Sequence, residues 1–251
     1  MTGNEAARSF GAAVDAYDRG RPTYPDDAVD WLLAHAPRHD SAADERTRAV
    51  DLGAGTGKFT ASLVARGLDV VAVEPDVSML ARLREHLPGV DAREGTAEAI
   101  PLPDASVDLV TMAQAWHWVD AERASAEVAR VLAPGGVVAL VWNIRDESEP
   151  WVRRLGEVAG SSPAERFETL RPPLGPALEH VASAAFDWSF ELDREAVLAM
   201  FASRSYLIAL PEEERAEVLA GVGRVVDEEF AEAEAITMPY ATRVTIARHA
   251  S

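Results

Sequence analysis

Short strand-like segments separated by helix-length segments recur through the middle of this chain, and this alternation constrains the fold more than any other feature. Most of the segments are near-continuous runs of Val, Ala and Leu, which suit strands buried on both faces of a sheet. The five segments are residues 48–52, 69–75, 90–95, 107–112 and 137–143. The pattern predicts a doubly wound α/β core with a mostly parallel sheet and helices on both faces.

Two later segments, residues 184–192 and 240–249, alternate apolar and polar side chains as half-buried strands do. Two helical patterns lie between them, from residue 193 to about residue 235. We expect the late strands to extend the same sheet within a single domain over residues 1–251, and the helices between them to form a cap.

The first 45 residues precede the alternating core. Residues 5–18 have a helical pattern, which two prolines then interrupt. A second helix is predicted over residues 27–36, with Asp26 or Asp27 as its N-cap, because an Asp side chain can accept hydrogen bonds from the first backbone N–H groups of a helix. We expect this region to fold over the core as a helical lid.

The net charge and the absence of cysteine exclude several kinds of substrate and site. The chain has 24 basic and 42 acidic residues, a formal net charge of −18, which would repel a polyanion, so a nucleic-acid substrate is not expected. Cysteine is absent, which excludes disulfides, thiolate metal sites and a cysteine nucleophile, and no metal site is expected. No signal peptide and no apolar run of roughly 18 residues are present, so we expect a cytoplasmic protein that does not span a membrane.

Three glycines, Gly53, Gly55 and Gly57, lie between the first strand and the next helix, where the backbone must pass close to a ligand. A dinucleotide-binding G-x-G-x-x-G turn would need its third glycine or alanine at position 58, which is Lys58. An NAD(P)-dependent oxidoreductase on a related fold is therefore disfavoured, although it stays open as an alternative. The spacing of a Walker-type phosphate loop is absent.

Two acidic residues accompany the glycine loop. Glu74 ends the second strand, where a carboxylate can accept hydrogen bonds from both hydroxyls of a ribose. Asp51 lies beside the turn, where it suits an ammonium group and would repel a phosphate. A nucleoside that carries an amino acid meets both demands. The alternative is that the glycine turn is an ordinary feature of an α/β fold and that Glu74 is merely exposed.

Four segments of the core form an ordered series: "VDLGAGTGKFT" (50–60), "VVAVEPDVSML" (70–80), "EGTAEAIPLPDASVDLVTMAQAWHW" (94–118) and "VLAPGGVVALVWN" (131–143). Together they resemble the motifs of class I S-adenosylmethionine (SAM)-dependent methyltransferases of the small-molecule type. Several motifs in order are far more specific than one glycine loop. The stretches "RPTYP" (21–25) and "WNIRDESEPWV" (142–152) further resemble the methyltransferase type 11 subgroup that includes trans-aconitate methyltransferase-like proteins.

This resemblance implies SAM as the cofactor and a Rossmann-like, seven-stranded sheet whose last strand is antiparallel. We expect three parts of one domain: a lid (1–45), a cofactor-binding core (46–145), and a sheet extension with an acceptor cap (146–251). The expected cofactor contacts are Asp51, Gly53, Ala54, Gly55, Thr56 and Gly57 at the methionine part, Glu74 at the ribose, Pro75 and Met79 at the adenine faces, Thr96, Ala97 and Glu98 at the adenine edge, Gln114 and Ala115 at the sulfonium, and Tyr24 of the lid.

The stretch "AQAWHW" (113–118) ends the fourth strand, at the edge where open α/β sheets bind ligands. Tryptophan faces attract a cation such as a sulfonium by roughly 0.5–2 kcal/mol, which suggests a role for Trp116 and Trp118. Imidazoles titrate near neutral pH, which makes His117 a candidate base for an acceptor hydroxyl or amine. Alternatively, the two tryptophans pack against the sheet and His117 bonds locally.

We expect methyl transfer to an oxygen of a small molecule, either a hydroxyl or a carboxylate. A carboxylate is already ionised and needs positioning more than a base. Arg21 and Arg145 are then the candidate catalytic residues, because a guanidinium binds a carboxylate through two hydrogen bonds. A catalytically silent cofactor-binding or scaffold protein would carry the same loop and acids, so it stays open as well. We expect a monomer or a homodimer.

Overall fold

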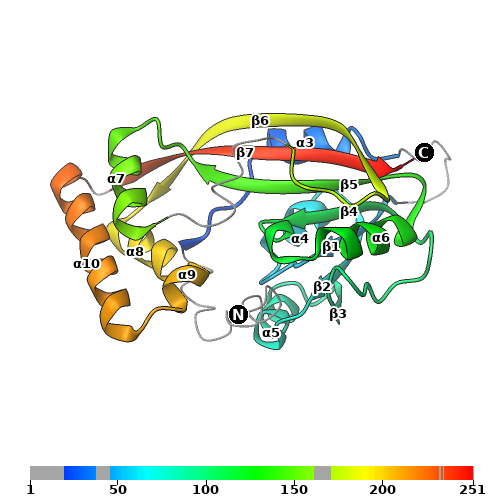
Figure 1. Ribbon diagram of the computed structural model, residues 1–251, viewed down its shortest axis with the longest axis horizontal. Helices are drawn as coiled ribbons and strands as arrows, with labels where there is room; N and C mark the ends of the chain where they lie inside the picture. The colour runs from blue at the N-terminus through cyan, green and yellow to red at the C-terminus, as the bar shows by residue number, and fades with distance from the viewer. Residues whose placement is uncertain (1–19, 38–45, 161–170, 232, 234, 251) are drawn as a thin grey trace.

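The computed structural model describes residues 20–37, 46–160, 171–231, 233 and 235–250. Its centre is a seven-stranded sheet in the order β3-β2-β1-β4-β5-β7-β6 (Figure 1). Strands β1 to β5 pair in parallel, whereas β7 runs antiparallel to both β5 and β6. The predicted sheet, including its antiparallel last strand, is confirmed. The strands are β1 Arg48–Leu52, β2 Asp69–Glu74, β3 Asp91–Glu94, β4 Val107–Ala113, β5 Leu132–Arg145, β6 Leu178–Leu192 and β7 Ile236–His249.

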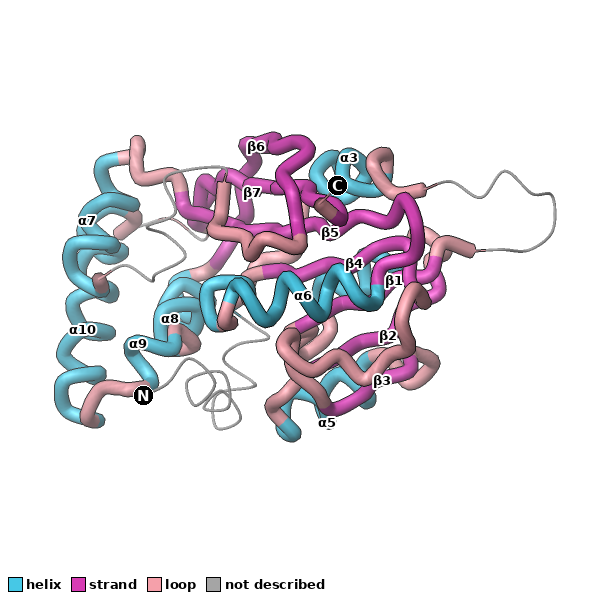
Figure 2. Tube along the Cα trace, turned by 45° about the vertical axis from the view of Figure 1, so that its right-hand side comes forward, coloured by secondary structure: helices cyan, strands magenta, loops and turns pink. Residues whose placement is uncertain are grey.

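Helices cover both faces of the sheet, as predicted (Figure 2). On one face, Leu32, Phe59 and Leu63 of the helices α3 and α4 pack with β1, β4, β5 and β7. On the other face, Ala124 and Val128 of α6 pack with inward side chains of the same sheet. The helices around the core are α3 Asp26–Leu33, α4 Lys58–Val64, α5 Val77–His86 and α6 Ala121–Val131, and a short 3-10 helix covers Trp116–Trp118.

The C-terminal helices form a second core at the far end of β5, β7 and β6 (Figure 1). They are α7 Pro150–Ala159, α8 Arg194–Ala202, α9 Ser205–Ile208 and α10 Glu212–Glu229. Met200, Phe201 and Leu207 are fully buried there. The sequence predicted two helices between the late strands, but the described residues form three. The short helix α9 lies between Ser203, the C-cap of α8, and Pro211, the N-cap of α10.

Several predicted boundaries needed correction. Strands β6 and β7 begin six and four residues earlier than predicted, because the two strands pair along their whole length. Neither Asp26 nor Asp27 caps α3: Pro25 is its N-cap, and both acids lie in the first turn, where negative charge favours the helix dipole. The helix predicted over residues 5–18 lies outside the described residues.

Among the described residues, no helix has the length and apolar character needed to cross a membrane. The same part of the chain contains no group of three or more His, Asp or Glu side chains arranged to hold a metal ion.

Candidate active site

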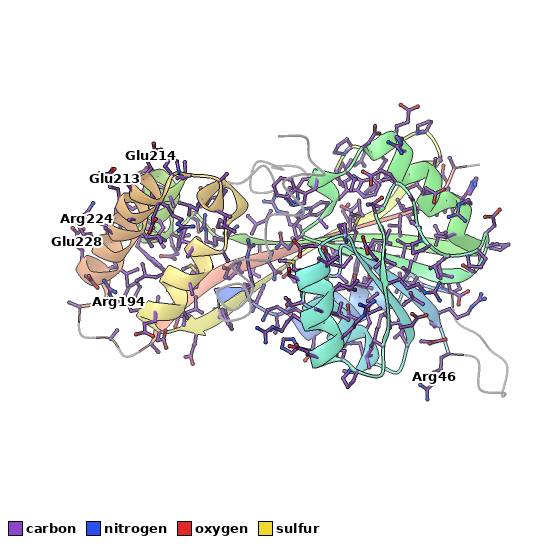
Figure 3. All side chains as sticks on the ribbon, turned by 90° about the horizontal axis from the view of Figure 1, so that it is seen from below. Arg46, Arg194, Glu213, Glu214, Arg224 and Glu228 are labelled. Carbon is purple, nitrogen blue, oxygen red and sulfur yellow. The ribbon has the colours of Figure 1, made fainter. Side chains whose placement is uncertain are left out.

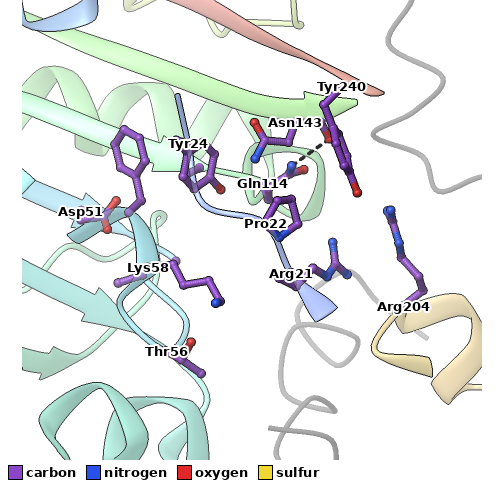
Figure 4. A pocket seen from close by; sticks show the side chains of 14 residues that line it. Arg21, Pro22, Tyr24, Asp51, Thr56, Lys58, Gln114, Asn143, Arg204 and Tyr240 are labelled. Atoms are coloured by element: carbon purple, nitrogen blue, oxygen red, sulfur yellow. Dashed lines mark hydrogen bonds between the residues drawn. The ribbon is translucent and has the colours of Figure 1, made fainter. Parts of the chain in front are cut away.

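A pocket opens at the carboxyl ends of β1, β4 and β5, the edge at which the sequence predicted ligand binding (Figure 4). It encloses about 530 Å³ of space, part of which is open to solvent. Its walls come from segments that are far apart in the sequence. The lining residues are Arg21, Pro22, Tyr24, Asp51, Gly53, Ala54, Thr56, Lys58, Phe59, Ala113, Gln114, Asn143, Arg204 and Tyr240.

The glycine loop adopts backbone conformations that favour glycine. Gly53, Gly55 and Gly57 have φ values of +64°, +58° and +90°, which side chains other than glycine rarely tolerate. The backbone N–H of Gly53 donates to the carbonyl oxygen of Val73 at 2.8 Å. A Cβ atom at Gly53 would lie only 2.8 Å from the Cβ of Ala115. The structure therefore brings the loop against one of the two residues expected at the sulfonium.

Asp51 is buried in the pocket wall and held by two hydroxyl groups. Its Oδ2 accepts from Thr60 Oγ1 at 2.7 Å, and its Oδ1 accepts from Thr111 Oγ1 at 2.8 Å. Burial raises the pKa of Asp51 from 3.8 to about 6, and the two hydroxyls oppose part of that rise. A carboxylate can accept about four hydrogen bonds, so Asp51 keeps capacity for a further donor.

Glu74 is buried, with 4% of its surface exposed, so the alternative of a merely exposed residue was wrong. Its Oε2 accepts from the backbone N–H of Gly55 and its Oε1 from that of Asp76, both at 2.8 Å. Burial raises the pKa of Glu74 to about 7. The side chain thus ties the glycine loop to the start of α5, whose N-cap is Asp76.

The residues expected around the adenosine do not line this pocket. Met79 and Ala97 are buried in the cores of the sheet, and Pro75 follows β2 directly. Thr96 forms a short bridge with Ala99, and Glu98 Oε1 accepts from the backbone N–H of Asp120 at 3.0 Å. The pocket therefore brings together only the methionine and sulfonium part of the expected contacts: Tyr24, Asp51, Gly53, Ala54, Thr56 and Gln114.

Gln114, at the end of β4, has a backbone φ of +58°, which is unusual for a residue with a side chain. Its backbone N–H donates to the carbonyl of Val141, and its Nε2 donates to the carbonyl of Asn143 at 3.0 Å. A strained residue persists only where the surrounding contacts hold it in place, and such residues are frequent at functional sites.

The two predicted arginines lie at different depths. Arg21 lines the pocket, and its Nε donates to the hydroxyl of Ser203 at 3.2 Å. Arg145 is 2% exposed, and its guanidinium carbon lies 4.7 Å from the ring centroid of Phe201. Arg145 is therefore behind the pocket wall, where an aromatic face stabilises its charge.

The structure does not place the histidine and tryptophans of "AQAWHW" in the pocket lining. Trp116 is 1% exposed within the core beneath α6, and its Nε1 donates to the carbonyl of Pro173 at 2.8 Å. The ring of His117 lies 4.6 Å from the ring of Trp118. Packing of Trp116 against the sheet, the alternative to a sulfonium contact, is what the structure shows.

Sequence reasoning missed Asn143, Arg204 and Tyr240 as pocket residues. Arg204 follows α8 within the segment predicted to be a cap, but the sequence offers no signal that singles it out. Tyr240 pairs with Arg145 across β5 and β7, and this register is visible only once the late strands are aligned. Lys58, noted in the sequence only for what it excludes, also lines the pocket.

Comparison with known proteins points to one family. The model of the methyltransferase domain family matches residues 50–140. An uncharacterized methyltransferase of Mycobacterium tuberculosis is 48% identical over 246 residues, 95% of this chain and 96% of the relative. A methyltransferase-like protein of Schizosaccharomyces pombe is 36% identical over 226 residues, 87% of this chain and 86% of the relative. The structure of a proposed type II methyltransferase from Anaeromyxobacter dehalogenans is 28% identical, with a TM-score of 0.68 over 91% of this chain and 97% of that one.

The sheet order, the glycine loop with its buried acids and these relatives define a methyltransferase of the Rossmann-like class. This chain belongs to the class I SAM-dependent methyltransferase family, and SAM is its cofactor. The oxidoreductase alternative is thereby excluded. The narrower likeness to trans-aconitate methyltransferase-like proteins stays a prediction.

Proposed function

We propose that this methyltransferase transfers the methyl group of SAM to a carboxylate oxygen of a small molecule. The observation that supports this most directly is the presence of two guanidinium groups, Arg21 and Arg204, in the pocket wall that faces the glycine loop (Figure 4). They come from the segment before α3 and from the residue position just before α9. Guanidinium groups bind carboxylates with directional, charge-assisted hydrogen bonds.

The charge of the pocket is opposite to that of the chain. The whole sequence has a formal charge of −18, yet the charged pocket residues are Arg21, Lys58, Arg204 and a single acid, Asp51. SAM itself adds a sulfonium cation. An anionic acceptor would be attracted into this pocket by the three basic side chains in its lining and by the sulfonium of the cofactor.

The proposed chemistry asks little of the protein beyond positioning. A lone pair of the carboxylate oxygen attacks the methyl carbon while the carbon–sulfur bond breaks. Its electron pair goes to the sulfur, which becomes the neutral thioether of S-adenosylhomocysteine (SAH). No proton is transferred, so no base is required, and holding the reacting atoms in line supplies much of the acceleration.

One relative supports transfer to oxygen. A malonyl-[acyl-carrier protein] O-methyltransferase of Methylococcus capsulatus is 42% identical over 137 residues, 52% of this chain and 48% of the relative. This likeness covers only about half of each protein, so it supports the chemistry and not a particular acceptor. A hydroxyl acceptor would need a base, and the candidate base, His117, does not line the pocket.

The type of bond formed can be tested without knowing the acceptor. The protein is incubated with methyl-labelled SAM and a small-molecule extract of the cells that make it, and the labelled products are treated with mild base. A methyl ester releases its label as methanol, whereas methyl ethers, N-methyl and C-methyl products keep it. We expect base-labile label that is absent with heat-inactivated protein. Base-stable label as the main product would contradict the proposal.

We further propose that Asp51 receives the ammonium group of the cofactor. Because the pKa of Asp51 is about 6 in the free protein, an ammonium partner must displace a proton below that pH. The affinity for SAH, measured by calorimetry, should therefore rise about tenfold between pH 5 and pH 7. If the ribose binds the ionised form of Glu74, whose pKa is about 7, a separate rise is added over the same range. Asp51→Asn should remove the tenfold part that belongs to Asp51 and leave the part that belongs to Glu74. An unchanged pH dependence in Asp51→Asn would show that the ammonium is bound elsewhere.

The free protein should show the opposite trend in stability. The pKa of Asp51 is raised from 3.8 to about 6 on folding, so the folded state favours the protonated form. This contribution is complete below about pH 4 and is lost as the pH rises through about 6, an effect of at most about 3 kcal/mol. Urea unfolding at pH 5 and pH 7 should show a smaller difference in Asp51→Asn than in the wild type.

A further inference from the structure

A segment before α3 crosses the pocket and joins its two sides. We call residues 20–24 the strap. At its start, Gly20 packs so closely on α8 that a Cβ there would overlap the backbone of Met200. Arg21 bonds Ser203 at the end of α8. At its other end, the ring of Tyr24 packs edge-on against Phe59 of α4, with ring centroids 4.8 Å apart.

The middle of the strap is held by a chain of side-chain hydrogen bonds that crosses three strands. Trp188 Nε1 in β6 donates to Thr242 Oγ1 in β7 at 2.8 Å. Thr242 Oγ1 donates to Asn143 Oδ1 in β5 at 2.6 Å. Asn143 Nδ2 then donates to the carbonyl oxygen of Thr23 at 2.8 Å. Thr242 is fully buried and Asn143 is 6% exposed, so water cannot easily replace these bonds.

The indole of Trp188 fixes which group donates and which accepts in each of these three hydrogen bonds. An indole N–H can only donate, so Thr242 must accept from Trp188 and use its own proton toward Asn143. Asn143 must then present its oxygen to Thr242 and its NH2 group to the strap. Only one orientation of the Asn143 amide makes both hydrogen bonds, and in that orientation its NH2 group donates to the Thr23 carbonyl.

We infer that Asn143 is a positioning residue that fixes the strap over the pocket, and that it acts on cofactor affinity through Tyr24, whereas Arg21 is the strap side chain assigned above to the acceptor. Both strap side chains line the pocket beside Asn143 itself. Releasing the Thr23 carbonyl frees the strap between its two anchors, so its pocket-facing side chains lose their fixed positions. This inference does not depend on the acceptor proposed above, because its probe is SAH.

A double-mutant cycle separates action through the strap from a direct contact. SAH affinity is measured by calorimetry for the wild type, Asn143→Ala, Tyr24→Ala and the double variant. We expect each single change to weaken binding about tenfold, and the double change to weaken it by little more than the larger single change. Additive effects, about a hundredfold in the double variant, would overturn the inference.

The hydrogen bond that Asn143 donates to the Thr23 carbonyl can also be tested through the pH dependence of SAH affinity. In Asn143→Asp the introduced carboxyl can accept from Thr242, but it can donate to the Thr23 carbonyl only when it is protonated. The ratio of the variant and wild-type dissociation constants should therefore fall as the pH is lowered from 8 to 5. The ionisable groups that surround this position are present in both proteins, so their own titration cancels in the ratio: Arg21, Asp51, Lys58, Arg145, Arg204 and Tyr240. A ratio that is constant with pH would show that Asn143 does not act through a donated hydrogen bond.

Thr242→Val should reproduce most of the loss seen in Asn143→Ala, because it removes the donor that orients the amide. Thr245→Val is the matched control: Thr245 is equally buried on β7, but its hydroxyl lies 3.4 Å from that of Ser183 and does not bond Asn143. Equal losses of SAH affinity in the two threonine variants would contradict the inference, since a general weakening of β7 would then explain both.

Discussion

Truncation of Glu74 to alanine should weaken SAH binding by about 30- to 1000-fold, or roughly 2–4 kcal/mol. Two losses combine in this estimate. The first is the pair of hydrogen bonds that the carboxylate is expected to accept from the ribose. The second is the loss of two hydrogen bonds within the protein, because the backbone N–H groups of Gly55 and Asp76 both donate to the Glu74 carboxylate. The glycine loop would then have to be ordered by the ligand.

The matched control is Glu94→Ala. Glu94 ends β3 and pairs in register with Glu74, but it is exposed. Calorimetry should find its SAH affinity unchanged. Glu74→Gln should fall between the two, because an amide keeps one acceptor oxygen of similar reach. Circular dichroism of each variant shows whether it is folded at the temperature of the titration. A folded Glu74→Ala protein with wild-type affinity would mean that the ribose is held elsewhere.

Loss of the Arg204 guanidinium should raise the acceptor KM by about 10- to 150-fold and change kcat little, the effect of removing a charge-assisted hydrogen bond worth roughly 1.5–3 kcal/mol. Arg204 is 7% exposed and lines the pocket, so an anion bound there is shielded from competing water. Arg204→Ala is assayed with the acceptor that the labelling experiment isolates. SAH affinity, measured in parallel, should stay near the wild-type value.

Two further variants make this prediction specific. Arg224→Ala, on the exposed side of α10, controls for a change in net charge and should leave KM unaltered (Figure 3). His117→Asn should keep kcat within about threefold between pH 6 and pH 9, because a carboxylate acceptor has no proton to remove. A kcat reduced by about 10²-fold or more in His117→Asn would instead indicate a neutral acceptor with a histidine base.

The part of the site that could be read from the sequence is the part encoded locally. The loop with Gly53, Gly55 and Gly57 predicts that the backbone passes close to a ligand. The two acids, Asp51 and Glu74, lie at or near the ends of strands that are clear from their apolar runs. The fold followed from the same local signals. Strand ends and the break between α8 and α9 did not, because pairing and packing decide them.

The opposite wall of the pocket could not be read in this way. Asn143, Arg204 and Tyr240 reach the pocket only through the packing of the C-terminal helices and the register of β5 with β7. For the stretch 113–118, the sequence predicted the position along the chain correctly but the orientation of the side chains wrongly. Its place after β4 was correct, but a 3-10 turn directs Trp116 into the core, and no local pattern specifies that direction.

Strands β5, β6 and β7, with 14, 15 and 14 residues, each extend roughly 45–50 Å. Strands β6 and β7 contribute side chains both to the core beside the cofactor-binding sheet and to the C-terminal helical core, and β5 pairs with β7 from Val137 to Arg145. A hinge between these two cores would have to bend three hydrogen-bonded strands at once. We therefore expect the distance between the glycine loop on one side of the pocket and Arg204 on the other to stay fixed. If the acceptor binds as proposed, we expect this distance to select acceptors by their length, and a longer acceptor would require changes in the α8–α9 corner or in the strap.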